Sequence, residues 1–223
     1  MSQKPNRAVL FVNGDLPEPE KIRAQLTTDD LLIAVDGGMR HMASLGLIPD
    51  LIIGDLDSAN PALMQDYRTQ GVEIRTFPVD KDETDLEIAL DASLDLGLES
   101  IWVVAALGGR MDQSLGNIFL LTRPDLANYD IRLVDGLSEV FLIRTSASIN
   151  GEVGERVSLL PLSGPADGIH TQGLQFPLEN ETLYPHKTRG ISNRLSSPSA
   201  TISLQRGLLL CIHETTQMNK RSG

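Results

Sequence analysis

Residues 1–135 alternate short apolar runs with stretches that favour helices, and this alternation restricts the fold more than any other feature of the chain. The helical stretches carry signals of their own. Leu86, Leu90 and Leu94 recur near the helical period, and Thr84 with Glu87 has the pattern of a capping box. Helices between successive strands predict an α/β domain in which helices flank a mainly parallel sheet. The expected strands are 8–12, 31–35, 50–53, 72–77, 100–107 and 131–134, and the expected helices are 19–26, 39–45, 61–70, 84–96 and 111–121.

The character of the chain changes after Gly136. Short apolar runs at 139–143, 156–160, 200–204 and 208–213 are separated by glycine, proline, serine and asparagine, without a long helical period. This spacing is typical of an antiparallel β domain that resembles a sandwich. We therefore expect an α/β domain at 1–136, a β domain at 137–214 and a polar, frayed tail at 215–223.

Charge and hydropathy exclude several classes of protein. Thirty acidic against nineteen basic residues give a formal net charge of -11, which argues against a non-specific nucleic-acid binder. No apolar stretch approaches the ~20 residues of a membrane span, and the run at 8–12 is too short for a signal peptide. The single cysteine, Cys211, lies in an apolar run and is expected to be a buried core thiol. We expect a cytoplasmic protein with neither a nucleic-acid nor a membrane partner.

Acidic residues follow four of the expected strands. Asp36, the pair Asp55 and Asp57, Asp85, and Asp112 each lie in a loop that comes after a different strand, mostly beside glycines. In open α/β sheets, ligands bind at the carboxyl ends of the strands. Each motif alone could be a plain turn or a helix cap. Four of them at one sheet edge predict a binding site.

The mutual repulsion of these carboxylates indicates what the site binds. Two carboxylates ~4 Å apart repel by roughly 4 kcal/mol at an effective dielectric constant near 20. That is a heavy load for a fold whose whole stability is about 5–15 kcal/mol. A divalent cation removes the repulsion, and an all-oxygen ligand set without His or Cys favours Mg²⁺. Because Mg²⁺ takes its remaining ligands from water and phosphate, the acidic edge also predicts a phosphate substrate.

Positive partners for the phosphates lie in the same loops. Arg110 can bind phosphate oxygens in a bidentate manner, Lys81 supplies a point charge, and the backbone amides of Gly108 and Gly109 open a helix. Solvation or local pairing of the two cations with Asp82 and Asp112 is the alternative. The chain contains no phosphate-loop, protein-kinase or dinucleotide-binding motif. The four histidines lack a nucleophile motif beside them and are expected to be structural or solvent-facing.

Taken in order, the motifs resemble those of thiamine diphosphokinases, also called thiamin pyrophosphokinases. Each motif is weak alone, but the ordered set covers nearly the whole chain. The matching segments are Asp36-Gly-Gly38, Pro49-Asp-Leu-Ile-Ile-Gly-Asp-Leu-Asp-Ser58, Lys81-Asp-Glu-Thr-Asp85, Gly108-Gly-Arg-Met-Asp-Gln113, Gly190-Ile-Ser-Asn193 and the final strand at 207–212. Leu56 stands where many relatives carry phenylalanine, which is an apolar replacement between two acids.

The resemblance implies an activity: transfer of a diphosphoryl group from ATP to the hydroxyethyl oxygen of thiamine, leaving AMP. It implies an N-terminal catalytic domain that binds Mg²⁺ and nucleotide, a thiamine-binding β domain, and a homodimer with active sites near the subunit interface. It also implies roles for residues. The metal ligands would be Asp55, Asp57 and Asp85, and Asp36 and Asp112 would be further catalytic acids. The nucleotide side would include Gly37, Gly38, Lys81, Asp82, Thr84, Gly108, Gly109, Arg110 and Gln113, and the thiamine side would include Ser192 and Asn193.

Several questions stay open at the level of sequence. Asp85 and Asp112 are both candidates for the group that accepts the hydroxyl proton. A diphosphokinase for another heteroaromatic alcohol, such as a hydroxymethylpterin, would use the same magnesium chemistry, although the segment ending at Asn193 favours thiamine. An acidic sheet edge of this kind would also suit a non-catalytic sensor of Mg²⁺-nucleotide or thiamine, or a Mg²⁺-dependent phosphohydrolase.

Overall fold

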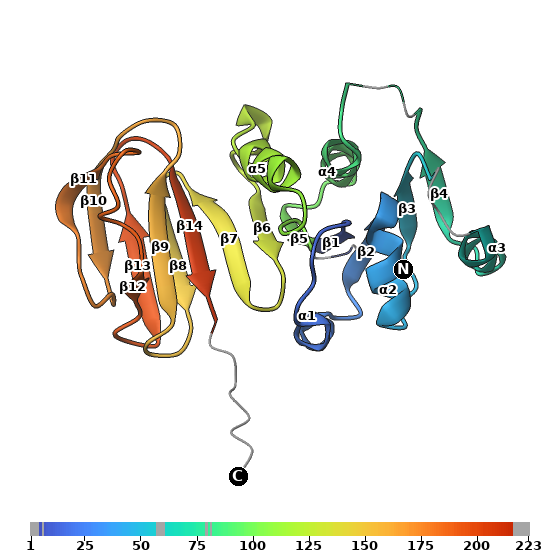
Figure 1. The fold of residues 1–223 in the computed structure, drawn as a ribbon, viewed down its shortest axis with the longest axis horizontal. Helices are drawn as coiled ribbons and strands as arrows, with labels where there is room; N and C mark the ends of the chain where they lie inside the picture. Colours follow the sequence, from blue (N-terminus) through green and yellow to red (C-terminus); the bar gives the residue numbers. More distant parts are fainter. Residues whose placement is uncertain (1–4, 6, 57–60, 79, 81, 216–223) are drawn as a thin grey trace, which may run out of the picture. The chain divides into compact units, whose positions relative to one another are not determined.

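The structure is a computed structural model that describes residue 5 and residues 7–56, 61–78, 80 and 82–215 (Figure 1). The chain divides into two compact units, Met1–Gly136 and Leu137–Gly223, which we call the N-terminal and C-terminal units. Among the described helices, none has the length and apolar character needed to cross a membrane.

The described residues of the N-terminal unit form six parallel strands in the order β6-β5-β1-β2-β3-β4. The mainly parallel sheet predicted from the sequence is confirmed, and each expected strand is present. Their bounds are β1 (Arg7–Phe11), β2 (Asp30–Val35), β3 (Leu51–Gly54), β4 (Glu73–Thr76), β5 (Ser100–Val104) and β6 (Asp130–Val134).

Among the described residues, five α-helices connect these strands, and all five were expected from the sequence. Thr84 caps the fourth, because its Oγ1 accepts the backbone N–H of Glu87 at 3.2 Å. Their bounds are α1 (Pro19–Gln25), α2 (Met39–Ser44), α3 (Pro61–Thr69), α4 (Asp85–Asp95) and α5 (Met111–Leu120), with short 3₁₀ turns at η1 (Asp36–Gly38) and η2 (Pro124–Leu126).

The strand order assigns the helices to two layers. From β1 to β4 the chain advances in one direction across the sheet, and from β4 through β5 to β6 it returns in the other. Right-handed crossovers therefore put α1, α2 and α3 on one face and α4 and α5 on the other. Figure 1 shows α1 and α2 on the side opposite α4 and α5. The direction reverses between β1 and β5, which is the position where open α/β sheets bind ligands.

The centre of the N-terminal unit is a rigid base for the loops that leave the sheet. Ala8, Val9, Leu10 and Phe11 of β1 have no solvent exposure. Phe11 belongs to a buried cluster to which the other strands and α1–α3 contribute side chains, including Met42 of α2. A fully buried central strand holds its carboxyl end in a fixed place, and the next residues of the chain start from there.

The C-terminal unit consists of two antiparallel sheets, in the orders β12-β9-β14-β7 and β11-β10-β13-β8. The expected antiparallel β domain is confirmed. The strand bounds are β7 (Ser138–Ile143), β8 (Ser146–Asn150), β9 (Arg156–Pro161), β10 (Ala166–Gln172), β11 (Glu179–Leu183), β12 (Asn193–Arg194), β13 (Ser199–Ser203) and β14 (Leu209–Glu214).

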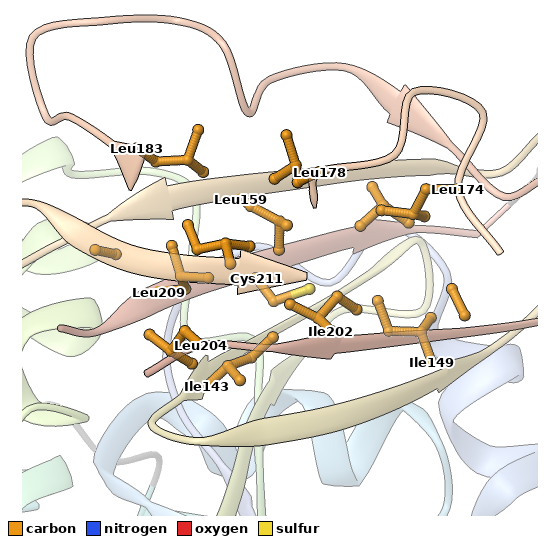
Figure 2. Close-up of a cluster of buried hydrophobic side chains, with 14 of the residues drawn as sticks. Ile143, Ile149, Leu159, Leu174, Leu178, Leu183, Ile202, Leu204, Leu209 and Cys211 are labelled. Atoms are coloured by element: carbon orange, nitrogen blue, oxygen red, sulfur yellow. The ribbon is translucent and has the colours of Figure 1, made fainter. Parts of the chain in front are cut away.

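The core of the C-terminal unit is a cluster of aliphatic side chains from both sheets. Figure 2 shows Leu159 and Leu209 of the first sheet beside Ile202 of the second, with Cys211 among them. Cys211 has no solvent exposure, so the expectation of a buried core thiol is confirmed.

Candidate active site

A pocket of about 510 Å³ opens at the carboxyl edge of the parallel sheet. It lies where the strand order reverses, because residues directly after β1 and β5 line it together with residues after β2 and β3 and from α4 and α5. Seven of the residues singled out from the sequence line this pocket: Asp36, Asp55, Thr84, Asp85, Gly108, Asp112 and Gln113.

Four aspartates line the pocket, each from a different segment that follows a strand of the sheet. Asp36 follows β2, Asp55 follows β3, Asp85 begins α4, and Asp112 lies in the first turn of α5. Asp57 and Lys81, which the sequence also places here, lie outside the described residues. Asp82 is described, but it is solvent-exposed and does not line the pocket. Segments that are far apart in sequence therefore bring these four aspartates to one hollow, and Glu83 adds a fifth carboxylate.

The backbone around the pocket is strained at three strand ends. Asp36, Leu56 and Ala105 have φ angles of 44°, 59° and 60°, in the left-handed region. Each of them follows the end of β2, β3 or β5 by at most two residues. A residue with a side chain in this region costs about 1–2 kcal/mol, and such strain concentrates at functional sites. The left-handed conformation turns the chain sharply at the end of each strand and directs the following loop across the edge of the sheet.

Glycines at 37, 38 and 54 allow these loops to pack closely. A Cβ atom on Gly38 would come 1.8 Å from the carbonyl oxygen of Phe11, and one on Gly37 would overlap the side chain of Asn13. A Cβ on Gly54 would press on Asp36 at 3.1 Å. Gly37 and Gly38 do not line the pocket, so the expectation that they contact the nucleotide stays a prediction. The close packing around them is sufficient to require residues without a side chain.

The entry to α5 differs from the sequence-based expectation. The backbone N–H of Gly109, expected to bind phosphate, donates to Oδ2 of Asp15 at 3.1 Å. Arg110 donates to both carboxylate oxygens of Asp112, from Nε at 3.2 Å and from Nη2 at 2.5 Å. This is the local pairing that the sequence left as an alternative. The hydrogen bonds from Arg110 lower the pKa of the Asp112 carboxyl below its usual value.

The sequence interpretation missed the loop after β1. Asn13 and Gly14 line the pocket, and Arg40 of α2 donates to their carbonyl oxygens at 3.0 and 2.9 Å. The Nε2–H of His41 donates to the carbonyl of Gly14 at 3.0 Å, and burial lowers the pKa of the His41 imidazole. The missed signal is a fifth example of the same pattern, because Asn13, Gly14 and Asp15 directly follow the first expected strand.

Asn117 is a second residue that sequence reasoning missed. It lies on the side of α5 that lines the pocket, and its Nδ2 donates to the carbonyl oxygen of Ala106 at 2.7 Å. The bond connects α5 to the loop after β5. No motif in the sequence distinguishes this asparagine from one on a solvated helix face.

The donor set of the pocket suits a hard cation. The side chains from which a metal ligand could come are carboxylates, amides and the hydroxyl of Thr84, which all offer the oxygen atoms that Mg²⁺ prefers. Within the described part of the chain, no three His, Cys, Asp or Glu residues form a ready-made metal cage. Mg²⁺ in nucleotide sites commonly takes only one or two protein carboxylates, so Asp55 and Asp85 fit this mode.

Comparison with known proteins assigns both units to one family. The sequence model of the thiamin pyrophosphokinase catalytic domain matches residues 22–133, and that of the thiamin pyrophosphokinase vitamin B1 binding domain matches residues 145–209. The chain belongs to the thiamine pyrophosphokinase family.

Individual relatives agree with the assignment to the thiamine pyrophosphokinase family. The thiamine pyrophosphokinase of Bacillus subtilis is 30% identical over 203 residues, which cover 88% of this chain and 95% of that protein. Thiamine pyrophosphokinase 1 of Oryza sativa is 32% identical over 146 residues, but the match spans only 54% of its length and 60% of this chain. The crystal structure of thiamine pyrophosphokinase from Bacillus subtilis matches with a TM-score of 0.85 at 26% identity, covering 95% of this chain and all of that one.

The region that matches the vitamin B1 binding domain of the thiamine pyrophosphokinase family contains Ser192 and Asn193. Ser192 is exposed in a left-handed conformation, with φ at 61°, and its N–H donates to Oγ of Ser158 at 3.0 Å. Asn193 is only 7% exposed, so its side chain lies within the unit.

The side chain of Asn193 holds the backbone of Phe176. Its Oδ1 accepts the N–H of Phe176 at 3.0 Å, and its Nδ2 donates to the carbonyl oxygen of Phe176 at 2.7 Å. The same Oδ1 also accepts the N–H of Arg194 at 2.9 Å. The amide group that the sequence assigned to thiamine thus bonds to the chain itself. Phe176, whose backbone Asn193 holds, is 53% exposed to solvent. The sequence interpretation missed Phe176.

Proposed function

We propose that this member of the family is a thiamine diphosphokinase. It transfers the diphosphoryl group of ATP to the hydroxyethyl oxygen of thiamine and releases thiamine diphosphate and AMP. The observation that carries the proposal is the pocket at the reversal of strand order, where Asp36, Asp55, Asp85 and Asp112 converge. The domain matches in both units supply the substrate pair.

The N-terminal unit is the nucleotide side of the reaction. An acidic pocket repels a bare triphosphate, since like charges ~4 Å apart cost roughly 4 kcal/mol at an effective dielectric constant near 20. Mg²⁺, held by Asp55 and Asp85 together with the predicted ligand Asp57, would neutralise this charge when bound. Asn13, Thr84 and Gln113 line the same pocket and offer neutral hydrogen-bonding groups to the nucleotide.

Arg110 can serve the phosphates as well as its own neighbour. It pairs with Asp112 at an exposed position, and exposed ion pairs contribute little to stability. Arg110 can therefore exchange from the carboxylate to a phosphate oxygen at small cost, with the bidentate geometry it already uses. The phosphate contact expected from the sequence and the ion pair with Asp112 seen in the structure are then two states of the Arg110 side chain.

Asp85 and Asp112 are the two candidates for the base that accepts the hydroxyl proton of thiamine. Both line the pocket, Asp85 from the N-terminus of α4 and Asp112 from the first turn of α5. The bonds from Arg110 lower the pKa of Asp112, and this effect is lost when Arg110 moves to a phosphate oxygen.

The C-terminal unit is the thiamine side. Thiamine carries a positive thiazolium ring and an aminopyrimidine, and both rings suit an aromatic face. Phe176 offers that face at a position fixed by Asn193, and Ser192, an exposed residue next to Asn193 in the sequence, has a hydroxyl that can form a hydrogen bond. Residues 1–136 thus form the nucleotide-binding domain and residues 137–214 the thiamine-binding domain in this proposal.

We further propose that the enzyme works as a homodimer in the cytoplasm. Three apolar side chains on one face of α5, Met111, Leu115 and Phe119, are 73%, 47% and 53% exposed. Their spacing of four residues makes one continuous row, and a second copy of the chain would cover it. Light scattering on the purified protein should give twice the mass of one chain.

The test of the function is incubation with ATP, Mg²⁺ and thiamine, followed by quantification of the products. Thiamine diphosphate and AMP should appear in equal amounts, and AMP should not form when thiamine is omitted. AMP release without an acceptor would indicate a phosphohydrolase, and faster reaction with a hydroxymethylpterin would indicate the other diphosphokinase. Binding of either substrate without turnover would indicate a sensor.

A further inference from the structure

The loop of residues 13–15, which follows β1, is bonded along its length to the loop that follows β5. The N–H of Gly14 donates to the carbonyl of Ala105, and that of Asp15 to the carbonyl of Leu107, both at 2.8 Å. Beyond these backbone bonds, Oδ2 of Asp15 accepts the N–H of Gly109 at 3.1 Å, across 94 residues of sequence. The Asp15 carboxylate also lies against Gly108, where a Cβ atom would come 2.3 Å from Oδ2.

The same loop is held from its other side by α2. Arg40 donates to the carbonyl oxygens of Asn13 and Gly14, and His41 donates to that of Gly14. Asp15 is therefore not a free surface acid. It projects from a loop that is held in place by the loop after β5 and by α2. Its carboxylate in turn holds the backbone N–H of Gly109.

The turn at Gly108 and Gly109 needs such a constraint. Both residues are in the left-handed region, with φ at 85° and 63°, and glycine has many other conformations of similar energy. The next residues form the start of α5, which carries Asp112 and Gln113 into the pocket. A change of dihedral angles at Gly109 would swing this first turn, and a displacement of about 1 Å at a reacting site can cost about 100-fold in rate.

Asp15 acts from outside the pocket that holds the aspartates. It does not line that pocket, and it faces a second hollow on the other side of Gly108, together with Leu16, Pro17 and Asp135. Gly108 is the wall that the two hollows share. A carboxylate at this position contacts the glycine turn and lies outside the lining of the proposed nucleotide pocket.

We propose that Asp15 is a positioning residue for the diphosphoryl transfer. Its carboxylate holds the Gly108–Gly109 turn and thereby orients Asp112 and Gln113 toward the nucleotide. The inference rests on the proposed function. It requires an acceptor atom at the position of Oδ2 and does not require the negative charge.

Three substitutions separate the acceptor from the charge. Asp15→Asn keeps an oxygen acceptor and removes the charge, Asp15→Ala removes both, and Asp15→Glu keeps the charge but displaces it by one methylene. We expect Asp15→Ala and Asp15→Glu to lower kcat by about 10- to 100-fold and to raise the KM for ATP, with the KM for thiamine within about twofold of wild type. Asp15→Asn should stay within about threefold of wild type in every constant. Asp29→Ala removes an exposed charge just before β2 and serves as the control.

The readouts distinguish this inference from the function on which it rests. If the wild-type chain makes thiamine diphosphate and Asp15→Ala is as active, the positioning role fails alone. Equal impairment of Asp15→Asn and Asp15→Ala, or full activity of Asp15→Glu, would show that the charge is what matters and would overturn it. If the wild type is inactive, calorimetry with Mg²⁺-ATP still decides, because binding should weaken in Asp15→Ala and not in Asp15→Asn. A circular-dichroism melt of each variant identifies any that fails to fold, and the comparison of Asn with Glu then stands without the alanine variant.

Discussion

At the scale of single residues, backbone strain and negative charge occur at the same strand ends. Asp36 is itself in the left-handed region, and Leu56 in that region directly follows Asp55. Strained conformations persist only where the surroundings hold them, as the buried strands do here. The geometry of the acids is thus prepared before any ligand arrives, which favours catalysis by positioning.

Asp55 can be tested against an acid at the opposite end of the same strand. Asp55→Asn should lower kcat by about 100-fold or more, because it removes a charge from the proposed metal site while the side chain keeps its size. Asp50 precedes β3, and its carboxylate accepts the N–H of Leu32 at 2.8 Å, a bond that asparagine can also make. Asp50→Asn should therefore behave as wild type. Near-normal turnover of Asp55→Asn in a steady-state assay would remove Asp55 from the metal site, and the same holds for Asp57→Asn.

His41 gives the N-terminal unit a pH dependence with a definite sign. Burial lowers the pKa of His41 in the folded state below its usual value near 6.5, so the unfolded chain binds the proton more readily. The free energy of unfolding should therefore fall as the pH is lowered through about 6.5. His41→Gln keeps a donor for Gly14 and does not titrate, so its advantage over wild type should grow between about pH 7.5 and pH 5.5. Urea titrations at several pH values measure this, and parallel curves for the two proteins would contradict it.

Some of the site residues could be read from the sequence, and others could not. Asp36, Asp55, Asp85 and Asp112 were predicted because each follows an apolar run, and the edge of a parallel sheet gathers whatever follows its strands. The contact between Asp15 and Gly109 depends on β1 lying next to β5, and strand order is a property of tertiary pairing. The hydrogen bonds of Asn193 with Phe176 join the two-residue strand β12 to an irregular loop, and neither segment shows a sequence period.

At the scale of elements, prediction was good where periodicity was strong. Every described strand and α-helix of the N-terminal unit was expected, with most ends displaced by one residue and the expected strand at 100–107 running three residues too far. In the C-terminal unit, β8, β10, β11 and β12 were not expected. β11 buries a single side chain, Leu183, and β12 has only two residues, so neither shows a readable alternation of apolar and polar side chains.

Helix α5 contains a glycine whose replacement by alanine should raise stability and impair activity. Gly116 lies within α5 and lines the pocket, and a Cβ atom there would meet no atom within 4 Å. Gly116→Ala should raise the free energy of unfolding by about 0.5–1 kcal/mol, because glycine is a poor helix former. The added methyl group enters the proposed nucleotide pocket, so the KM for ATP should rise.

A second glycine gives the opposite result and serves as the contrast. Gly38→Ala should lower the free energy of unfolding by about 1–3 kcal/mol, because its Cβ would collide with the backbone of Phe11. Urea unfolding monitored by circular dichroism measures both variants. A destabilised Gly116→Ala variant, or a Gly38→Ala variant as stable as wild type, would contradict these expectations.

At the scale of the whole molecule, the proposed function divides the two substrates between the two units. The sequence places the boundary between Asp135 and Glu139, from the change in pattern, and the compact units of the structure meet after Gly136. The ordered motifs predicted the family and its chemistry correctly, since both domain matches agree with them. The proposed homodimer rests on the family resemblance and on the exposed face of α5, and periodicity alone did not indicate it.

This division predicts separable kinetic effects. Phe176→Ala should raise the KM for thiamine by about tenfold, which corresponds to about 1.4 kcal/mol of aromatic contact with a cationic ring. The KM for ATP should stay within about twofold. Ser192→Ala and Asn193→Ala should act in the same direction, the latter because it releases the backbone of Phe176. Val153→Ala, at an exposed apolar position of the same unit, is the control. Equal changes in both Michaelis constants would place Phe176 away from thiamine.

The position of Cys211 makes the chain a natural reporter of its own opening. It is the only cysteine in the sequence, and it lies fully enclosed in the core of the C-terminal unit (Figure 2). A maleimide or a disulfide reagent can reach the sulfur only when that unit opens, so the labelling rate measures fluctuations of the proposed thiamine side alone. Fluorescent labels can be attached through cysteines introduced on the surface without first replacing the native one, because the native thiol is shielded as long as the protein stays folded.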